Sequence, residues 1–563
     1  MNQSTGQQTG TNGMEFDFII IGAGSAGCVL ANRLSADPSH RVLLIEAGPE
    51  DKAWSIKIPA ACLVNLNSTR HNWAFEGEPE PELNNRRVKH DRGKTLGGSS
   101  SINGMVYIRG HALDYDGWQQ AGCDGWSYAD VLPYFKKMEN YSAGGDDYRG
   151  GDGPLKVKRP DASNPIFSTF VKAGEEAGYP VTDDINGYRQ EGFGRLDRST
   201  YRGQRWSASR AYLDPARKRR NLTIITRAQV NKITITNGRA TGVDYTVSGR
   251  TVHATATRDV ILSAGAVGSP QLLMLSGIGP GSHLHDHGIE VLHDLPGVGA
   301  NLQDHPDYVM KFECKKPVSI WPQTRFFGRI AAGVQWLLSG TGVCASNQFD
   351  VVACIRSGPG VPFPDLQYTI SPIAVDGESW QPLPMHAFQI HLGLMRAHSR
   401  GTIRLRDAEP SSPPLIQVNY LQDPRDRELM HKGIQYIREL VEQPSFRDLC
   451  GEEIFPGAHI HSEADIDESL NAEATTQWHL SGTAKMGAAT NRDAVVDSKG
   501  RVHGIEGLRV VDASIMPMVT NGNTNSPTLM MAEKLSDAIL GNAPLPRNDI
   551  EVWQNPDYET CQR

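Results

Sequence analysis

The sequence feature that most constrains the fold is a glycine-rich segment between two short apolar runs near the N-terminus. The first run, residues 17–21 (DFIII), is typical of a buried parallel strand and leads into Gly22-Ala23-Gly24-Ser25-Ala26-Gly27. Apolar residues at helical spacing follow, and a second apolar run, residues 41–45 (RVLLI), ends at Glu46. Strand, G-x-G-x-x-G, helix, strand and acid in this order predict a βαβ unit that binds a dinucleotide.

Each residue type in this unit has a chemical reason. Gly22 permits the tight turn after the strand, Gly24 lets the backbone approach a pyrophosphate, and Gly27 lets helix and strand pack closely. The pyrophosphate is expected at the helix N-terminus, where free N–H groups and the helix dipole favour an anion. Glu46, 24 residues after Gly22, suits a ribose hydroxyl. The unit alone leaves NAD and FAD both open.

Composition excludes several other classes of protein. The net charge of −8 gives no basic footprint for nucleic acid, and the eight cysteines include no C-x-x-C pair of a zinc or redox site. No apolar stretch approaches the ~18–20 residues of a membrane span, and residues 1–13 lack the parts of a secretory signal. We therefore expect a cytoplasmic protein, soluble or peripheral at the membrane, with no metal site and a disordered N-terminal tail.

A second unusual segment covers residues 92–107 (RGKTLGGSSSINGMVY). Val88 stands where a Walker A loop requires glycine, so this is not a P-loop. The residues themselves fit either a glycine–serine surface loop or a backbone wrapped against a flat cofactor.

Residues 92–110 resemble the first signature of the glucose-methanol-choline (GMC) family of FAD-dependent alcohol oxidoreductases, and residues 268–279 (GSPQLLMLSGIG) resemble the second. Further matches run from about residue 16 to residue 540, and within the family the chain is most similar to the choline dehydrogenases. The resemblance implies an α/β fold in which an FAD-binding Rossmann-like domain is interleaved with an α+β substrate domain built on an antiparallel sheet. A homodimer is one assembly that we allow for.

The expected domains follow from the resemblance and from the strand pattern. The FAD domain is expected at residues 14–158, 200–305 and 472–542, the substrate domain at 159–199 and 306–471, and tails at 1–13 and 543–563; the C-terminal tail would pack on a neighbouring subunit or be disordered. Apolar runs at 259–263 and 508–511 end in small residues or an acid, which lets separated segments touch one long ligand at a sheet edge and favours FAD. Alternation over residues 388–392 indicates the antiparallel sheet.

The predicted FAD-binding residues come from the glycine motif and from the matching family elements. They are Gly22, Gly24, Ser25, Ala26, Gly27, Glu46, Ala47, Trp73, Arg92, Leu96, Gly98, Ser99, Asn103, Gly104, Met105, Val106, Val230, Ala264, Gly265, Trp478, Asp512, Ala513, Asn523 and Thr524. Some family members attach FAD through a His that aligns with Ile102, which is no nucleophile, so non-covalent FAD is expected.

The catalytic pair implied by the resemblance is His479 and Asn523. Residues 477–487 (QWHLSGTAKMG) look like the family's H-P-x-G-T-x-x-M-G element with Leu480 in place of Pro, and residues 520–527 resemble its partner. Oxidation of an alcohol removes a hydroxyl proton, for which a His base suits, and a hydride that passes to flavin N5. Asn523 would hold the same oxygen. Trp478 would shape the pocket, gate oxygen or pack on the flavin.

Asp350 is the predicted substrate residue, together with Trp478, His479 and Asn523. The choline branch usually has Glu at this position, so an acid there can face a cationic head, although a partner Arg is the alternative. The residues that follow, 351–353, are bulkier than in that branch, which favours a bulkier or less cationic primary alcohol. A dehydrogenase with a quinone-like acceptor is expected. The alternatives are an alcohol oxidase using O2 and a non-redox member of lyase or photodecarboxylase type.

Overall fold

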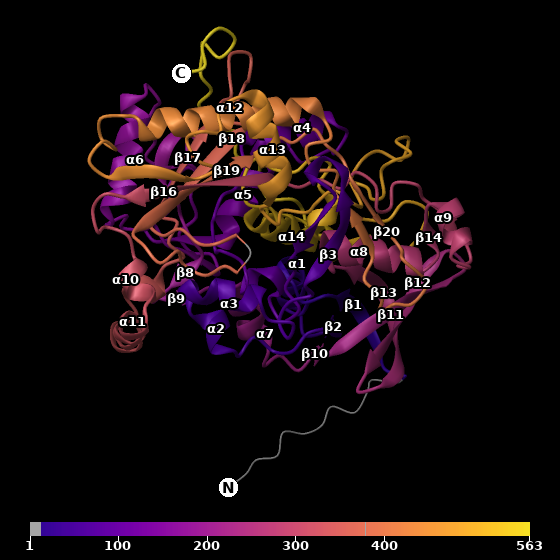
Figure 1. Ribbon diagram of the computed structural model, residues 1–563. Helices are drawn as coiled ribbons and strands as arrows, with labels where there is room; N and C mark the ends of the chain where they lie inside the picture. The colour runs from indigo at the N-terminus through magenta and orange to yellow at the C-terminus, as the bar shows by residue number, and fades with distance from the viewer. Residues whose placement is uncertain (1–12, 378) are drawn as a thin grey trace.

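A computed structural model of the chain describes residues 13–377 and 379–563. The predicted N-terminal tail, residues 1–13, thus lies outside the described residues except for Gly13. Two extended sheets organise the chain, one on each side of the central region (Figure 1).

The first sheet forms around the predicted dinucleotide unit. Its strand order is β10-β2-β1-β13-β12-β11, with β24 paired to β13. The bounds are β1 (Glu15–Ile21), β2 (Val42–Glu46), β10 (Leu222–Thr226), β11 (Ala228–Thr236), β12 (Arg239–Val247), β13 (Arg250–Leu262) and β24 (Leu508–Val510). Strands β10, β2, β1, β13 and β24 run parallel, so their carboxyl ends meet at one edge.

The second sheet is antiparallel and has the order β22-β16-β19-β18-β17-β7, with β23 paired to β16. The bounds are β7 (Gly192–Arg195), β16 (Pro306–Cys314), β17 (Val351–Ile355), β18 (Leu366–Ser371), β19 (Ala387–Leu394), β22 (Cys450–Phe455) and β23 (Thr475–Thr476). A Rossmann-like sheet and a separate antiparallel sheet confirm the predicted fold class.

Short two-stranded ladders complete the strands: β3 (Phe75–Glu80) with β4 (Arg86–His90), β5 (Glu139–Tyr141) with β6 (Leu155–Val157), β8 (Thr200–Tyr201) with β9 (Gln204–Arg205), β14 (Ile278–Gly279) with β15 (His293–Asp294), and β20 (Thr402–Arg404) with β21 (Leu415–Gln417). The ladder β20–β21 falls in the predicted substrate segment, yet it packs on β3 and α8 of the predicted FAD segments.

The helices are α1 (Ser25–Leu34), α2 (Trp54–Lys57), α3 (Cys62–Leu66), α4 (Ala112–Gln120), α5 (Tyr128–Met138), α6 (Pro165–Glu176), α7 (Asp214–Ala216), α8 (Gly265–Leu275), α9 (Gly281–Asp286), α10 (Trp321–Thr324), α11 (Phe326–Ser339), α12 (Pro424–Val441), α13 (Glu463–Glu473) and α14 (Asn525–Leu540). Helical turns are η1 (Pro59–Ala61), η2 (Pro81–Leu83), η3 (Gly98–Ser101), η4 (Ser209–Leu213), η5 (Val343–Ala345) and η6 (Ala513–Ile515). In the described residues, no helix has the length and apolar character needed to cross a membrane.

Helix α12 packs on one face of the second sheet. Its buried residues Ile434 and Ile437 follow helical spacing, and its Gly433 lies against Leu392 of β19. Figure 1 shows α12 lying over β17, β18 and β19. The helix therefore covers one face of the sheet and leaves the other toward the centre of the molecule.

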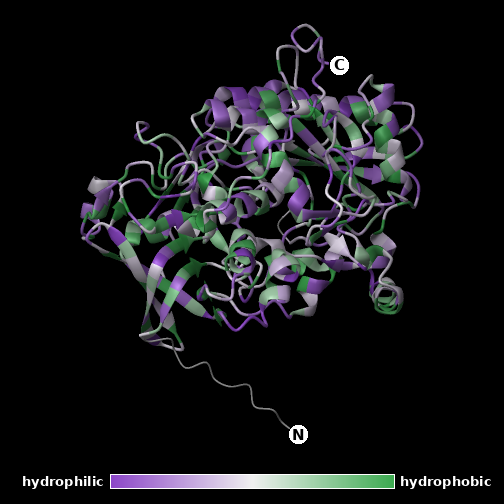
Figure 2. Ribbon diagram, turned by 180° about the vertical axis from the view of Figure 1, so that it is seen from behind, coloured by the Kyte–Doolittle hydropathy of each residue, from purple (hydrophilic) through white to green (hydrophobic). Residues whose placement is uncertain are grey.

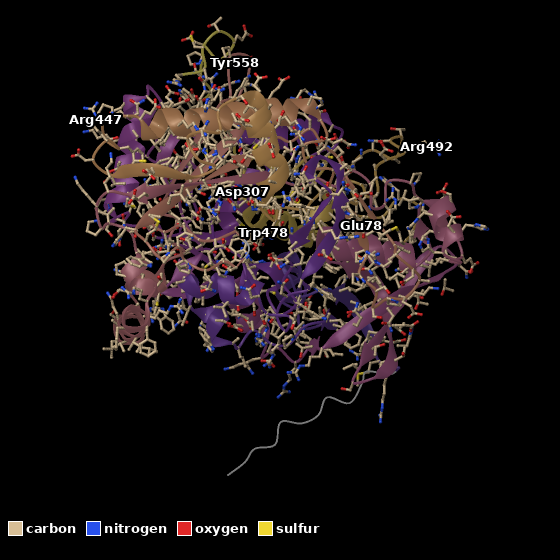
Figure 3. All side chains as sticks on the ribbon, viewed as in Figure 1. Glu78, Asp307, Arg447, Trp478, Arg492 and Tyr558 are labelled. Carbon is tan, nitrogen blue, oxygen red and sulfur yellow. The ribbon has the colours of Figure 1, made fainter. Side chains whose placement is uncertain are left out.

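The predicted C-terminal tail packs on its own chain. Arg356 donates from Nη2 to the Gln562 carbonyl at 2.6 Å, and Arg563 pairs with Glu439 of α12 at 2.5 Å. Tyr558 lies with this tail at the top of the molecule in Figure 3. The expectation of disorder was therefore wrong, because buried Arg356 supplies donors to the tail's carbonyls.

Candidate active site

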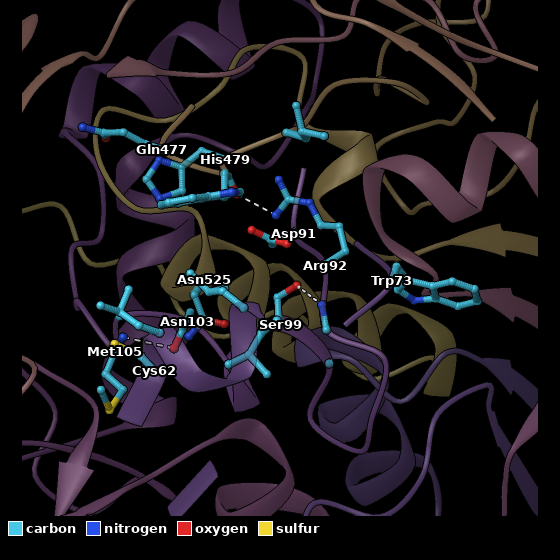
Figure 4. A pocket seen from close by; sticks show the side chains of 18 of the residues that line it. Cys62, Trp73, Asp91, Arg92, Ser99, Asn103, Met105, Gln477, His479 and Asn525 are labelled. Atoms are coloured by element: carbon cyan, nitrogen blue, oxygen red, sulfur yellow. Dashed lines mark hydrogen bonds between the residues drawn. The ribbon is translucent and has the colours of Figure 1, made fainter. Parts of the chain in front are cut away.

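A cavity of about 1400 Å³ runs from the glycine motif to the polar face of the second sheet. Figure 4 shows Gln477 and His479 on one side of it, with Ser99, Asn103 and Met105 across from them. In Figure 3, Asp307 and Trp478 lie near the centre of the molecule. The lining thus comes from both sheets and from the loops between them.

At one end of the cavity, close backbone contacts require glycine. A Cβ on Gly22, whose φ is +95°, would lie 2.5 Å from the Ser263 carbonyl oxygen, and one on Gly98 would lie 2.6 Å from Gly24 Cα. Helix α1 begins here with Gly24 at its N-cap and no side chain capping it. Its first N–H groups are therefore available to an anion such as a pyrophosphate.

Glu46 lies buried at the end of β2, beside the same turn. Its carboxylate accepts hydrogen bonds from the Ala23 N–H at 2.9 Å and the Gly48 N–H at 2.8 Å. Burial raises the pKa of Glu46 to about 7, against the lowering effect of these two N–H groups. A carboxylate has about four acceptor positions, so it can still accept from a ribose hydroxyl.

At the other end, His479 and Asn523 face each other on the cavity wall. Asn523 Nδ2 lies 3.0 Å from His479 Nε2, in the geometry of a donated hydrogen bond. On the far side of the ring, His479 Nδ1 lies 2.9 Å from His305 Nδ1, so the two rings share one proton there. Burial lowers the pKa of His479 well below its ordinary value of 6.5, and nearby His305 and Arg92 lower it further. The imidazole is therefore neutral at physiological pH.

His305 and Asp304 hold His479 from behind. The Asp304 carboxylate accepts from the backbone N–H of His479 at 2.7 Å and of His305 at 2.9 Å, and also from the hydroxyls of Thr476 and Tyr420. Burial lowers the pKa of His305 to about 3, so this ring is neutral as well. No role was predicted for these two residues from the sequence. They lie in residues 301–305 (NLQDH), one of the further matches to the family, and this motif was the available signal.

Several buried polar atoms of the cavity wall have no hydrogen-bond partner among the described residues. They are Arg92 Nη2, Gln367 Oε1, Trp478 Nε1 and Asn523 Oδ1. Arg92 itself is fixed, because its Nη1 donates to the Trp478 carbonyl at 2.6 Å. Buried polar groups normally have partners, so the cavity is built for a polar ligand, and the residues present fit FAD.

The second sheet turns a polar face to the cavity. Alternate residues of three neighbouring strands line it: Asp307, Val309 and Lys311 of β16, Gln389 and His391 of β19, and Gln367, Thr369 and Ser371 of β18. Asp307 accepts from Gln477 Nε2 at 3.1 Å and pairs with His391 Nδ1 at 2.8 Å. The aromatic rings of Phe349, Trp380 and Trp478 also line this end. A carboxylate among aromatic rings suits a cationic group.

The cavity brings together the predicted cofactor and catalytic residues with few exceptions. Of the positions predicted for FAD or substrate, Gly27, Leu96 and Asp350 do not line it. Gly27 acts in packing, since a Cβ there would lie 1.9 Å from the Gly22 carbonyl oxygen. Leu96 is buried in the core, and its backbone bonds to Pro49 and to Ser101. Its side chain therefore supports the loop instead of the ligand.

The prediction that Asp350 binds substrate was wrong. Its carboxylate pairs with Arg198 Nη1 at 2.5 Å and accepts from the Ser346 hydroxyl. The Asp350 carbonyl also accepts from the Leu196 N–H, which fixes it beside β7. The buried side chain of Arg198, on a distant segment, therefore binds the Asp350 carboxylate. The acid that the second sheet presents to the cavity is Asp307.

Comparison with known proteins shows the family to which the chain belongs. Residues 16–307 and 397–532 match two sequence models, both described as GMC oxidoreductase. The chain is 47% identical to oxygen-dependent choline dehydrogenase 1 of Chromohalobacter salexigens, over 96% of this chain and 98% of that protein. It is 49% identical to oxygen-dependent choline dehydrogenase of Pseudomonas aeruginosa, over 96% and 97%.

Two solved structures have a fold similar to that of this chain. The fold is similar to that of pyridoxine 4-oxidase from Mesorbium loti, with a TM-score of 0.85 and 30% identity over 94% of this chain and 100% of that one. It is also similar to formate oxidase of Aspergillus oryzae, a protein studied for its FAD modification, with a TM-score of 0.88 and 28% identity over 94% and 99%.

Proposed function

Because the chain belongs to the GMC oxidoreductase family and is an FAD-dependent alcohol oxidoreductase, we propose that it converts a primary alcohol to the aldehyde at the His479 end of the cavity. The observation that carries this proposal is the pairing of His479 Nε2 with Asn523 Nδ2, 3.0 Å apart on the cavity wall. Anaerobic mixing of the FAD-loaded protein with primary alcohols tests it: the yellow flavin colour is expected to bleach, and no bleaching across a broad panel would contradict the function.

In the proposed complex, FAD lies along the cavity from the glycine motif to His479. The backbone N–H groups of Gly24, Ser25 and Ala26 would hold the pyrophosphate, and Glu46 would accept from a ribose hydroxyl. Asn103 and the other lining residues of 92–106 would face the flavin from below His479. When bound, FAD supplies the two-electron acceptor for the hydride that leaves the carbinol carbon.

His479 takes the hydroxyl proton in this proposal. Burial, with no carboxylate at either ring nitrogen, keeps the ring neutral, so one ring nitrogen carries no proton and can accept one. Asn523 Nδ2 donates to Nε2, which places the ring proton on Nδ1, where His305 Nδ1 accepts it; Nε2 then faces the cavity as the base. Asn523 would hold the alcohol oxygen beside that nitrogen.

We propose a quinone-like acceptor for the electrons, as the resemblance to choline dehydrogenases implies, although the relatives' own names, oxygen-dependent choline dehydrogenases, point to O2. The alternative is O2, as in the oxidases of similar fold. Reoxidation of alcohol-reduced protein by a soluble quinone and by air distinguishes the two.

Asp307 is our proposed site for a cationic head of the substrate. The substitution Asp307→Asn keeps the shape of the side chain but removes its charge. An unscreened charge pair in a partly buried site is worth several kcal/mol. We expect kcat/KM for choline to fall at least about tenfold, while kcat/KM for its neutral carbon isostere, 3,3-dimethylbutan-1-ol, stays nearly unchanged. Steady-state kinetics with both alcohols measures this.

An equal loss with both alcohols would show that Asp307 acts on the structure of the cavity and not on the charge of the substrate. No loss with choline would favour the alternative of a bulkier or less cationic alcohol.

We further propose that FAD is bound without a covalent link. Ile102 lines the cavity at the position where some family members carry the linking His, and its side chain has no nucleophile. Denaturation followed by ultrafiltration is expected to release all of the yellow colour into the filtrate. Colour retained on the unfolded chain would overturn this prediction.

A further inference from the structure

Helix α11 (Phe326–Ser339) presents an apolar surface to the outside of the molecule. Its exposed large apolar side chains are Phe326, Phe327, Ile330, Val334, Leu337 and Leu338, and the exposed fraction reaches 82% at Phe327 and 84% at Leu338. Figure 1 shows the helix projecting from the body at the lower left, and Figure 2 shows its hydrophobic colouring from behind. A helix that is apolar on nearly all sides is ordinarily buried in a core or in lipid.

This helix is held in a fixed place despite its exposure. Trp336 donates from Nε1 to the Gly203 carbonyl at 2.6 Å, which ties the helix to the turn between β8 and β9. It packs on α10 (Trp321–Thr324) and on η5 (Val343–Ala345). The exposed apolar side chains therefore form a defined surface and are not side chains of a loose segment.

The charge around α11 complements an anionic partner. Arg325 and Arg329 stand at the start of α11, and residues 315–349 contain no acidic residue, in a chain whose net charge is −8. Arg202 and Lys156 lie beside Tyr201 in the ladder that anchors the helix, 5.1 and 5.7 Å from its ring centre. Basic residues around an apolar helix are the pattern of a surface that binds anionic lipid.

The length of α11 decides how it can meet a bilayer. Its 14 residues span about 21 Å, short of the roughly 30 Å hydrocarbon core, so it cannot cross. An apolar helix of this length can lie in the interface with its side chains among the lipid tails. We propose that α11 docks the protein on the surface of an anionic lipid bilayer.

The docking surface also adjoins the cavity. Arg329, Ala332 and Gly333 of α11 line it, as do the exposed side chains of Trp54 in α2 and Val64 in α3. A bilayer bound to α11 would therefore lie at that end of the cavity, whichever acceptor takes the electrons.

Co-sedimentation of the full-length, FAD-loaded protein with vesicles tests the proposal. We expect it to pellet with vesicles of mixed phosphatidylglycerol and phosphatidylcholine, and less with phosphatidylcholine alone. The double variant Phe327→Glu, Leu338→Glu is expected to stay in the supernatant while alcohol-driven flavin reduction is unchanged, because neither side chain lines the cavity.

The matched control is Val291→Glu with Leu292→Glu, which adds the same charge at two apolar side chains that are each 40% exposed, near α9 on the opposite side of the molecule. It is expected to pellet like the wild type. The proposal is overturned if the wild type does not bind anionic vesicles, or if the α11 variant binds them equally. It is also overturned if the lipid-free wild type is a dimer and the α11 variant a monomer, since the surface then belongs to a second copy.

Discussion

Replacing His479 by alanine is expected to slow alcohol-driven flavin reduction roughly 10²–10⁴-fold, the usual contribution of a positioned base. The variant removes the nitrogen that faces Asn523 and leaves the hydroxyl proton without an acceptor. FAD is expected to stay bound, because the glycine motif and Glu46 lie at the other end of the cavity. Anaerobic stopped-flow absorbance measures the rate, and the flavin spectrum of the purified variant measures its FAD content.

The control for this prediction is His461→Ala, which removes an exposed imidazole outside the cavity. It should reduce its flavin at the wild-type rate. If His479→Ala did so too, His479 would have no part in the chemistry. A variant that lost FAD would report on the fold of the cavity instead, and Asn523→Ala would then serve as the second test of the pair.

Gly27→Ala is expected to yield protein with almost no FAD. The added Cβ would lie 1.9 Å from the Gly22 carbonyl oxygen and 3.6 Å from Ile20 Cγ2. The Ile20 contact is an ordinary one, but the Gly22 carbonyl belongs to the backbone of the turn that directly follows β1, so α1 must move away from the sheet. That movement displaces the N–H groups expected to hold the pyrophosphate. The ratio of flavin to protein absorbance in the purified variant is the measurement.

The matched control is Gly117→Ala in helix α4. A Cβ there meets nothing within 4 Å, and Gly117 has an ordinary helical conformation. Alanine in a helix interior is favoured over glycine by about 0.5–1 kcal/mol, so this variant should bind FAD fully. Full FAD content in Gly27→Ala would show that the contact between α1 and β1 does not hold the cofactor site in shape.

The fold was largely predictable from sequence because its signals are local. The apolar runs before Gly22 and Glu46 became β1 and β2 within two residues of their predicted bounds, since buried parallel strands need continuous apolar side chains. The alternation at residues 388–392 lies in β19 of the antiparallel sheet. The course of the C-terminal tail was not predictable, because it depends on Arg356 from a distant segment.

The candidate site was predictable only where a linear motif carries it. His479 and Asn523 come from two such motifs, and the structure brings them into contact. The prediction that Asp350 binds substrate was wrong, because its partner Arg198 is 152 residues away in the sequence and no local pattern indicates the pair. Asp307 was missed, although the alternation of Asp307, Val309 and Lys311 along β16 marks one face of a strand. Which face of β16 meets the cavity depends on how α12 and the neighbouring strands pack, and this tertiary packing cannot be read from the local sequence.

We propose above all that the cavity oxidises a primary alcohol by moving its carbinol hydrogen to bound FAD while His479 takes the hydroxyl proton. A single anaerobic turnover, with the alcohol carrying either hydrogen or deuterium on the carbinol carbon, tests it most directly. We expect one aldehyde formed per flavin bleached, with bleaching clearly slower for the deuterated alcohol. Bleaching without aldehyde, or at the same rate for both alcohols, would contradict it.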